Sequence, residues 1–238
     1  MVPIGFTTGL LFKLPLPFEE RVKLMHSIGT EAIELSFATP KELFDCRPSV
    51  EIQALMKNFR YVTIHAPWKN VGYGRGIKTE RILIHLRYLC QKFPVKGIVV
   101  HPDTVFDFQK LEKSGLPILL ENVGRKKFGA DTEVFRTIRD RFNFGFVLDI
   151  EHAYDNDPTM KLAEEFYGVM GDRLRHMHVS GHRGSEMHVP VFLSDNRETV
   201  AEFLEEHSKH PIILEGIISK DVQERLRDEL NFVRKASR

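Results

Sequence analysis

The sequence lacks the features that mark membrane proteins, disulfide-stabilised proteins and strongly basic nucleic-acid-binding proteins. No apolar run approaches the roughly 20 residues of a membrane span. The N-terminus has no basic segment followed by a long apolar core, so we expect a first strand there and not a signal peptide. The only two cysteines, Cys46 and Cys90, match no zinc-finger spacing. With a formal net charge of +1, no overall field draws the protein to a membrane or to nucleic acid. We expect a cytoplasmic protein in a reducing compartment.

Linkers, low-complexity tracts and long charge runs are also absent, so we expect one domain over residues 1–238. Strand-like runs recur about every 30 residues, the length of a βα unit, with helix-period patterns between them. In two of these patterns, Thr132 is a candidate N-cap and Ser219 is the first residue. The strand-like runs are Ile4–Thr8, Ala32–Phe37, Tyr61–His65, Gly97–His101, Ile118–Glu121, Phe144–Asp149, Leu174–Val179 and Ile212–Glu215. Eight such units predict a single (β/α)8 TIM barrel.

What the sequence does have is a set of imidazoles and carboxylates placed at or just after the ends of these runs. The set is His65, His101, Glu121, Asp149, His152, His178, Glu186, His188 and Glu215. In a closed barrel the carboxyl ends of the strands form one rim, where catalytic residues gather. So many ionisable groups in one pocket would repel one another unless cations bound them. The mixture of imidazole and carboxylate ligands favours zinc, manganese or iron over magnesium or calcium.

The ordered motifs resemble those of the xylose-isomerase-like barrels, and within them the endonuclease IV family of abasic-site DNA repair enzymes. The resemblance covers nearly the whole chain. The matching pieces are HAP at 65–67, HP at 101–102, EN at 121–122, DxxH at 149–152, MHVS at 177–180, ExH at 186–188 and the glutamate at 215. It implies up to three zinc ions, or manganese in their place. The first would be held by His65, His101 and Glu121, the second by Glu121, Asp149, His178 and Glu215, and the third by His152, Glu186 and His188.

Two reactions follow from this resemblance. In a metal-dependent phosphodiester hydrolase acting on DNA with an abasic site, Glu121 would bridge two ions and Glu215 would orient the nucleophile. The sister branch, sugar and sugar-phosphate isomerases and epimerases, uses a single metal held by two Glu, one Asp and one His. In that reading Glu121 and Glu215 would pass a proton across the sugar. The ligands beyond this shared set favour the hydrolase: His65, His101, Glu186 and His188. A third reading is a metal-bearing binding protein without activity.

The sequence departs from the endonuclease IV pattern at several points. Glu186-Met187-His188 replaces Asp-x-His, and the loop after the first strand, GFTTGLLF, lacks the family's His-x-Ser and paired glycines. The stretch VPVFLSD stands where the family has a glycine-rich segment. Because the loops that contact DNA in the family are altered, the residues support metal chemistry more strongly than a DNA substrate.

Further residues near the predicted rim are candidates for substrate binding, each with a structural alternative. Trp68 would stack on a sugar or base, or cap the barrel. Asn122 would bind a substrate oxygen, or turn the chain. Glu34 would face substrate, or form a salt bridge inside the barrel. Basic residues in the loops after the strands would attract a phosphate-bearing substrate, or form a solvated surface; they include Arg125, Lys126, Lys127 and Arg183.

Overall fold

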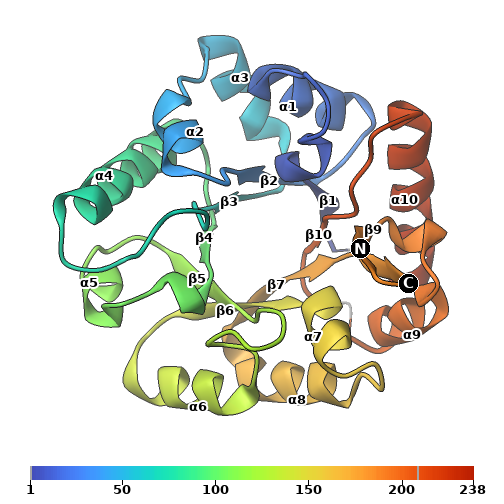
Figure 1. The fold of residues 1–238 in the computed structure, drawn as a ribbon. Helices are drawn as coiled ribbons and strands as arrows, with labels where there is room; N and C mark the ends of the chain where they lie inside the picture. The colour runs from blue at the N-terminus through green and yellow to red at the C-terminus, as the bar shows by residue number, and fades with distance from the viewer. Residues whose placement is uncertain (1, 208) are drawn as a thin grey trace.

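In the computed structural model, eight parallel strands close into a barrel surrounded by helices (Figure 1). The structure describes residues 2–207 and 209–238. The barrel strands are β1 (Ile4–Thr7), β2 (Ala32–Ser36), β3 (Tyr61–His65), β4 (Gly97–Val100), β5 (Ile118–Glu121), β6 (Gly145–Asp149), β7 (Leu174–Val179) and β10 (Ile212–Leu214). Pairing of Ile4 with Ile212 closes the sheet between β1 and β10. The predicted (β/α)8 barrel is confirmed, and each predicted strand is observed with its bounds shifted by no more than one residue.

Helices occupy the segments between the strands. They are α1 (Phe18–Ser27), α2 (Pro40–Asp45), α3 (Val50–Leu55), α4 (Ile77–Lys92), α5 (Phe108–Glu112), α6 (Thr132–Arg141), α7 (Ile150–Asn156), α8 (Lys161–Met170), α9 (Arg197–His207) and α10 (Val222–Ala236). Short 3-10 helices are η1 (Thr8–Leu11), η2 (Met56–Asn58), η3 (Pro102–Thr104), η4 (Gly171–Arg173) and η5 (Val191–Leu193). No helix among residues 2–207 and 209–238 is long and apolar enough to cross a membrane.

Two predicted helix starts differ from the observed ones. The N-cap of α6 is Asp131, whose side chain accepts a hydrogen bond from the backbone N–H of Val134, so Thr132 is the first helical residue instead. The last helix begins at Val222 and not at Ser219, because Asp221 before it adopts a left-handed backbone conformation (φ 49°). Neither shift moves a candidate site residue.

The two-residue period of the strands divides the core into two parts. Side chains such as Ile64, Leu120 and Leu148 face the helices and join the large apolar core. The alternate positions face into the barrel, where Val99, Leu119 and Val147 form a small separate cluster. Most of the other inward positions are polar, and Glu34, Thr63, His65, Glu121, Asp149, His176 and His178 among them are all buried. The interior is therefore apolar at one level and ionisable toward the carboxyl ends of the strands.

An antiparallel hairpin, β8 (Gly181–Arg183) and β9 (Glu186–Val189), follows β7 and was not predicted. The hairpin leads into η5, and its end packs tightly on the residue pair after β10. A Cβ at Gly216 would lie 2.4 Å from Cα of Pro190, so only glycine permits this approach. The contact brings residues 187–190 beside the carboxyl end of the barrel, where Ile217 donates a backbone hydrogen bond to the carbonyl oxygen of His188.

Candidate metal centre

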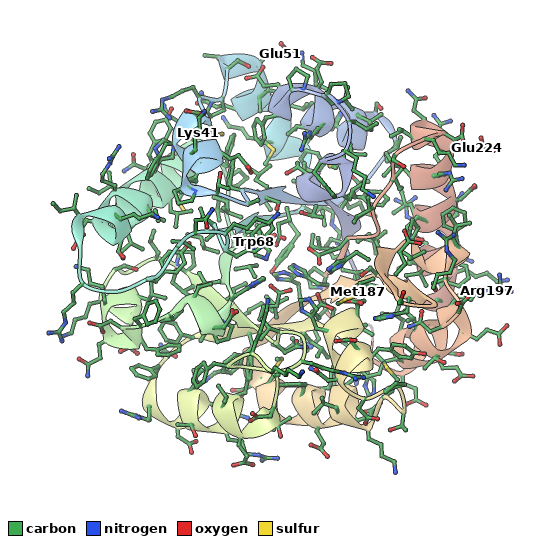
Figure 2. All side chains as sticks on the ribbon, viewed as in Figure 1. Lys41, Glu51, Trp68, Met187, Arg197 and Glu224 are labelled. Atoms are coloured by element: carbon green, nitrogen blue, oxygen red, sulfur yellow. The ribbon has the colours of Figure 1, made fainter. Side chains whose placement is uncertain are left out.

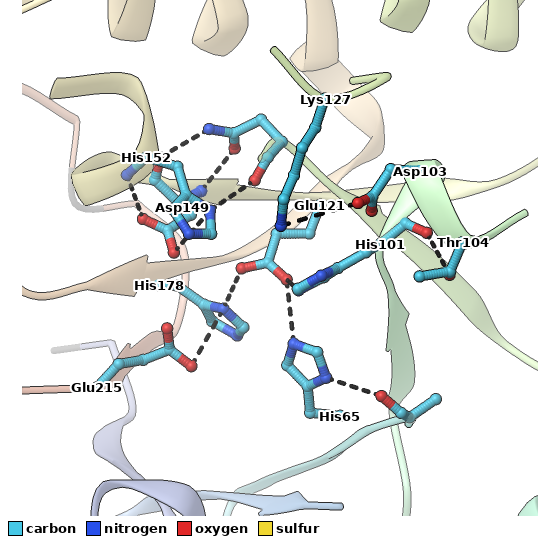
Figure 3. Close-up of polar contacts among 12 residues, drawn as sticks. His65, His101, Asp103, Thr104, Glu121, Lys127, Asp149, His152, His178 and Glu215 are labelled. Atoms are coloured by element: carbon cyan, nitrogen blue, oxygen red, sulfur yellow. Dashed lines mark hydrogen bonds and ion pairs between the residues drawn. The ribbon is translucent and has the colours of Figure 1, made fainter. Parts of the chain in front are cut away.

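Glu121, the last residue of β5, lies at the centre of the candidate site (Figure 3). Its Oε2 lies 3.2 Å from Nε2 of His65 and 3.1 Å from Nε2 of His101. Its Oε1 lies 2.7 Å from Nδ1 of His178. Burial alone would raise the pKa of Glu121, but the facing imidazoles of His178, His101 and His65 hold it well below its usual value. The carboxylate is therefore ionised, and its two oxygens face two different sets of imidazoles.

Asn122 and Asp149 fix the neighbouring part of the rim. The Asn122 amide donates to the carbonyl oxygen of Asp149 at 2.8 Å and accepts from its backbone N–H at 2.7 Å. Oδ1 of Asp149 accepts from the backbone N–H of His152 at 2.9 Å, which caps α7. Nδ1 of His152 lies 3.0 Å from the carbonyl oxygen of Asn122. A ring that donates its Nδ1–H in this way presents its Nε2 lone pair as a ligand.

His178 is held from below by residues inside the barrel. Its Nε2 lies 3.2 Å from Oε2 of Glu34 and 3.1 Å from Nε2 of His176. Thr63 donates its hydroxyl to the same Glu34 oxygen at 2.9 Å. His176 shares the inward face because it precedes His178 by two residues along β7. These contacts leave Nδ1 of His178 directed at Glu121 and Glu215.

Glu215 follows β10 and lies across the site from Glu121. Its Oε1 is 3.4 Å from Nδ1 of His178. Burial raises the pKa of Glu215 to about 8; the His178 charge opposes this shift, and the carboxylates of Glu121 and Asp149 add to it. Without a cation, a buried carboxylate beside two others is costly to ionise.

The ligand atoms gather into three groups at the rim. Within each group the atoms lie no more than 4.8 Å from one another. The groups are His65, His101 and Glu121; Glu121, Asp149, His178 and Glu215; and Glu151, His152 and His188. Oδ2 of Asp149 and both carboxylate oxygens of Glu151 are buried without a hydrogen-bond partner. Buried oxygens in this state need a compensating charge. The donor set of imidazoles and carboxylates therefore fits zinc or manganese ions.

A cavity of about 500 Å³ opens over these groups. Among its lining residues, Glu121 and Glu215 lie with four imidazoles: those of His65, His101, His152 and His188. Trp68 and Met187 also line it, and Figure 2 shows both near the centre of the barrel opening. The Trp68 ring meets the His65 ring edge to face, with centroids 4.6 Å apart. Basic side chains line the cavity at Arg125 and Lys127.

No family model and no curated protein matches this chain. Solved structures do. Endonuclease IV from Thermus thermophilus superposes with a TM-score of 0.72 at 18% identity, covering 98% of this chain and 99% of the other. A D-tagatose 3-epimerase-like protein gives a TM-score of 0.68 at 18% identity, covering 98% of both chains. A xylose isomerase domain containing protein from Salmonella typhimurium gives 0.70 at 14% identity, covering 99% of this chain and 97% of the other. The chain has the xylose-isomerase-like barrel fold.

Within this xylose-isomerase-like barrel, eight of the nine ligand candidates meet at one rim, and Glu186 does not. Its side chain is 56% exposed and forms an ion pair with Arg183 at 2.6 Å across the hairpin. The motif ExH would place Glu186 and His188 on one face of a regular strand. His188, however, has a left-handed backbone (φ 52°), which breaks the two-residue alternation. The ring turns toward His152 while the glutamate stays at the surface.

Sequence reasoning missed Glu151, which takes the position expected for Glu186. It directly precedes His152 in the segment DIEH, and this acid within the DxxH motif was the available signal. Glu151 lies in the first turn of α7 and is fully buried. The prediction considered residues at the ends of strands, where adjacent side chains point to opposite faces. Glu151 lies in a helix, whose adjacent residues can both be buried toward one pocket, so that pattern did not identify it.

The substrate-binding candidates divide into those at the cavity and those away from it. Trp68 and Arg125 line the cavity. Glu34 does not line the cavity but contacts His178 inside the barrel, which was the structural alternative given for it. Its inward position on β2 lies below the rim. Asn122 uses its amide to bind the backbone of Asp149 and so braces the rim. Lys126 and Arg183 are exposed outside the cavity lining.

Proposed function

We propose that this protein is a metal-dependent enzyme that cleaves a phosphodiester, with incision at an abasic site in DNA as the reaction. The observation that carries the proposal is the double orientation of Glu121. One oxygen faces His65 and His101, and the other faces His178. A single-metal enzyme needs only the group Glu121, Asp149, His178 and Glu215. A carboxylate whose two oxygens face two different ligand groups is instead suited to bridge two cations. Two-cation sites are common in phosphodiester hydrolysis.

The metal ions, when bound, would lower the pKa of water and stabilise the negative charge that develops on the phosphate. The protein side chains would do the rest. Oε1 of Glu215, beside His178, would accept a hydrogen bond from the attacking water and fix its direction. The water oxygen bonds to phosphorus as the bond from phosphorus to the 3′ oxygen breaks, and that oxygen leaves as a hydroxyl that carries the proton lost by the water. Arg125 and Lys127 at the mouth would attract the phosphate.

A second candidate is a single-metal isomerase or epimerase acting on a sugar or sugar phosphate. The group Glu121, Asp149, His178 and Glu215 is complete by itself for this reaction. The cavity of about 500 Å³ also has the size of a small-ligand site. In this reaction Glu121 and Glu215 would remove a proton from one carbon of the sugar and return it to the neighbouring carbon, or to the opposite face of the same carbon. Several structural neighbours are 3-epimerases or resemble them, including the D-tagatose 3-epimerase-like protein and D-psicose 3-epimerase.

One experiment separates the two candidates. Protein loaded with zinc or manganese is incubated with a duplex oligonucleotide containing one abasic site, and separately with ketoses with and without phosphate. We expect incision by the wild type, loss of incision in His65→Ala, and no change in His26→Ala, which alters an exposed histidine on α1. Ketose conversion that survives His65→Ala, with no incision by the wild type, would establish the isomerase and reject the hydrolase.

A further inference from the structure

Glu151 is the buried acid of the rim that the proposed reaction leaves without a task. It lies in the first turn of α7, which Asp149 caps, and no part of its surface is exposed to solvent. Both of its carboxylate oxygens lack a hydrogen-bond partner. A buried carboxylate without a partner is destabilising, so this position calls for a positive charge.

His182 is a side chain that approaches this carboxylate, with Nε2 2.5 Å from Oε1 of Glu151 but outside hydrogen-bonding geometry. Asp149 lies two residues earlier and brings a second carboxylate to the same part of the rim, and its Oδ2 also has no hydrogen-bond partner. Glu151, His152 and His188 each place one ligand atom within 4.8 Å of the others. This geometry favours an added cation.

Two imidazoles share this position with Glu151, and their outer nitrogens are already engaged. Nδ1 of His152 faces the carbonyl oxygen of Asn122 at 3.0 Å, and Nδ1 of His188 faces the hydroxyl of Ser180 at 3.3 Å. Metal-bound histidines commonly make such a contact with the ring nitrogen that does not bind the ion. Both rings line the cavity, so an ion can reach them from solvent.

Glu186 is unsuited to the same position. It is exposed and paired with Arg183 across the hairpin. The left-handed backbone of His188 separates the direction of its ring from that of Glu186. A non-glycine residue in this conformation costs energy that its surroundings must offset.

We infer that Glu151, His152 and His188 form a cation site of their own, in which Glu151 supplies the carboxylate and Glu186 takes no part. Two imidazoles and one carboxylate with a fourth position open to the cavity is a common zinc arrangement. The inference rests on the proposed metal centre but not on the reaction that the centre performs. It adds the carboxylate of Glu151, an acid within the DxxH motif, to the ligands at the rim.

The test is the number of ions bound, measured in the full chain without reference to turnover. Protein stripped with chelator is titrated with cobalt(II), and the ions bound per chain are counted by elemental analysis and by the visible absorption of four-coordinate cobalt. Glu151→Gln keeps the side-chain volume and should bind one ion fewer than the wild type. Glu186→Gln is the matched control, and it should bind as many ions as the wild type.

His188→Asn provides a second variant should Glu151→Gln fail to fold, because asparagine tolerates a left-handed backbone. It should also lose one ion. Loss of an ion in Glu186→Gln, a full complement in a folded Glu151→Gln, or a full complement in His188→Asn would each overturn the inference. Absence of both nuclease and isomerase activity, with the ion count falling as expected in Glu151→Gln, would reject the proposed function and leave the cation site standing.

Discussion

Replacing Glu121 with glutamine should lower thermal stability, metal content and turnover far more than replacing Glu186 with glutamine. Glu121 is buried between three imidazoles, whose nitrogens lie 2.7–3.2 Å from its oxygens. Glu186 is an exposed partner of Arg183. Both substitutions remove one negative charge and keep the shape of the side chain, so the comparison isolates the effect of position.

The size of the effect can be worked out for the metal-free protein. Burial by itself would lower the pKa of His178, but Glu215, Glu34 and Glu121 hold it well above its usual value. Removing one partner of a buried ion pair costs about 3–5 kcal/mol, and the two carboxylates that remain favour the lower end, about 3 kcal/mol. In a chain of 238 residues, each kcal/mol shifts the melting temperature by about 2–4 °C, which gives a loss of about 6–12 °C. The exposed pair of Glu186 contributes at most about 1 kcal/mol, so its loss should lower the melting temperature by less than about 4 °C.

The assays are thermal unfolding in chelator, metal content by elemental analysis, and turnover of the metal-loaded protein. Glu121→Gln should bind fewer ions, and a loss of about 4 kcal/mol of charge stabilisation would slow turnover about a thousandfold. Glu186→Gln should keep its metal and its turnover to within a few-fold. Equal losses in the two variants, or a greater loss in Glu186→Gln, would refute the central position given to Glu121.

Three further predictions concern residues around the centre. The loop after β5 carries the basic residues Arg125, Lys126 and Lys127. Replacing them with alanine should raise KM for a phosphate-bearing substrate and leave the metal content unchanged. The slope of log binding constant against log salt concentration should flatten by about one unit per lost phosphate contact. An unaltered KM and salt slope would make them ordinary surface residues. Asn122→Ala should cost about 2–5 kcal/mol in unfolding free energy, because it leaves the N–H and carbonyl of Asp149 without partners; a loss below about 1 kcal/mol in chemical denaturation would contradict this. Burial raises the pKa of Glu229 to about 7, so the folded chain holds a proton that the unfolded chain releases near pH 4.5, and stability falls as pH rises between these values. Between pH 4.5 and pH 7 the free energy of unfolding of the wild type should therefore fall by up to about 3 kcal/mol relative to that of Glu229→Gln. If the two unfolding free energies instead change in parallel with pH, Glu229 does not titrate in this range.

Much of the candidate site could be predicted because strand ends are local features of the sequence. His65, Glu121 and His178 each close a run of Val, Ile or Leu or lie near its end, and the closed barrel brings such ends to one rim. His101 and Glu215 follow the same rule one residue beyond their strands. These residues were recognisable without knowing which strands are neighbours.

Other positions depended on contacts between distant segments. Asn122 could have bound substrate, but β6 lies beside β5, and the amide bonds to the backbone of Asp149. Glu34 could have faced the cavity, but the inward positions of β7 carry His176 and His178 at its level. No periodicity within one segment reveals such a partner.

The eight strands, the barrel and the residues at the strand ends follow from the amino-acid pattern, because hydrophobic period and strand length are properties of short segments. Which acid joins His152 and His188 is set by contacts between distant segments. That choice depends on the left-handed backbone at His188 and on the burial of α7 against the barrel. The first arises where the hairpin after β7 packs on the residues after β10, and the second where α7 packs on β7 and α8. The sequence pattern contains the geometry of neither contact.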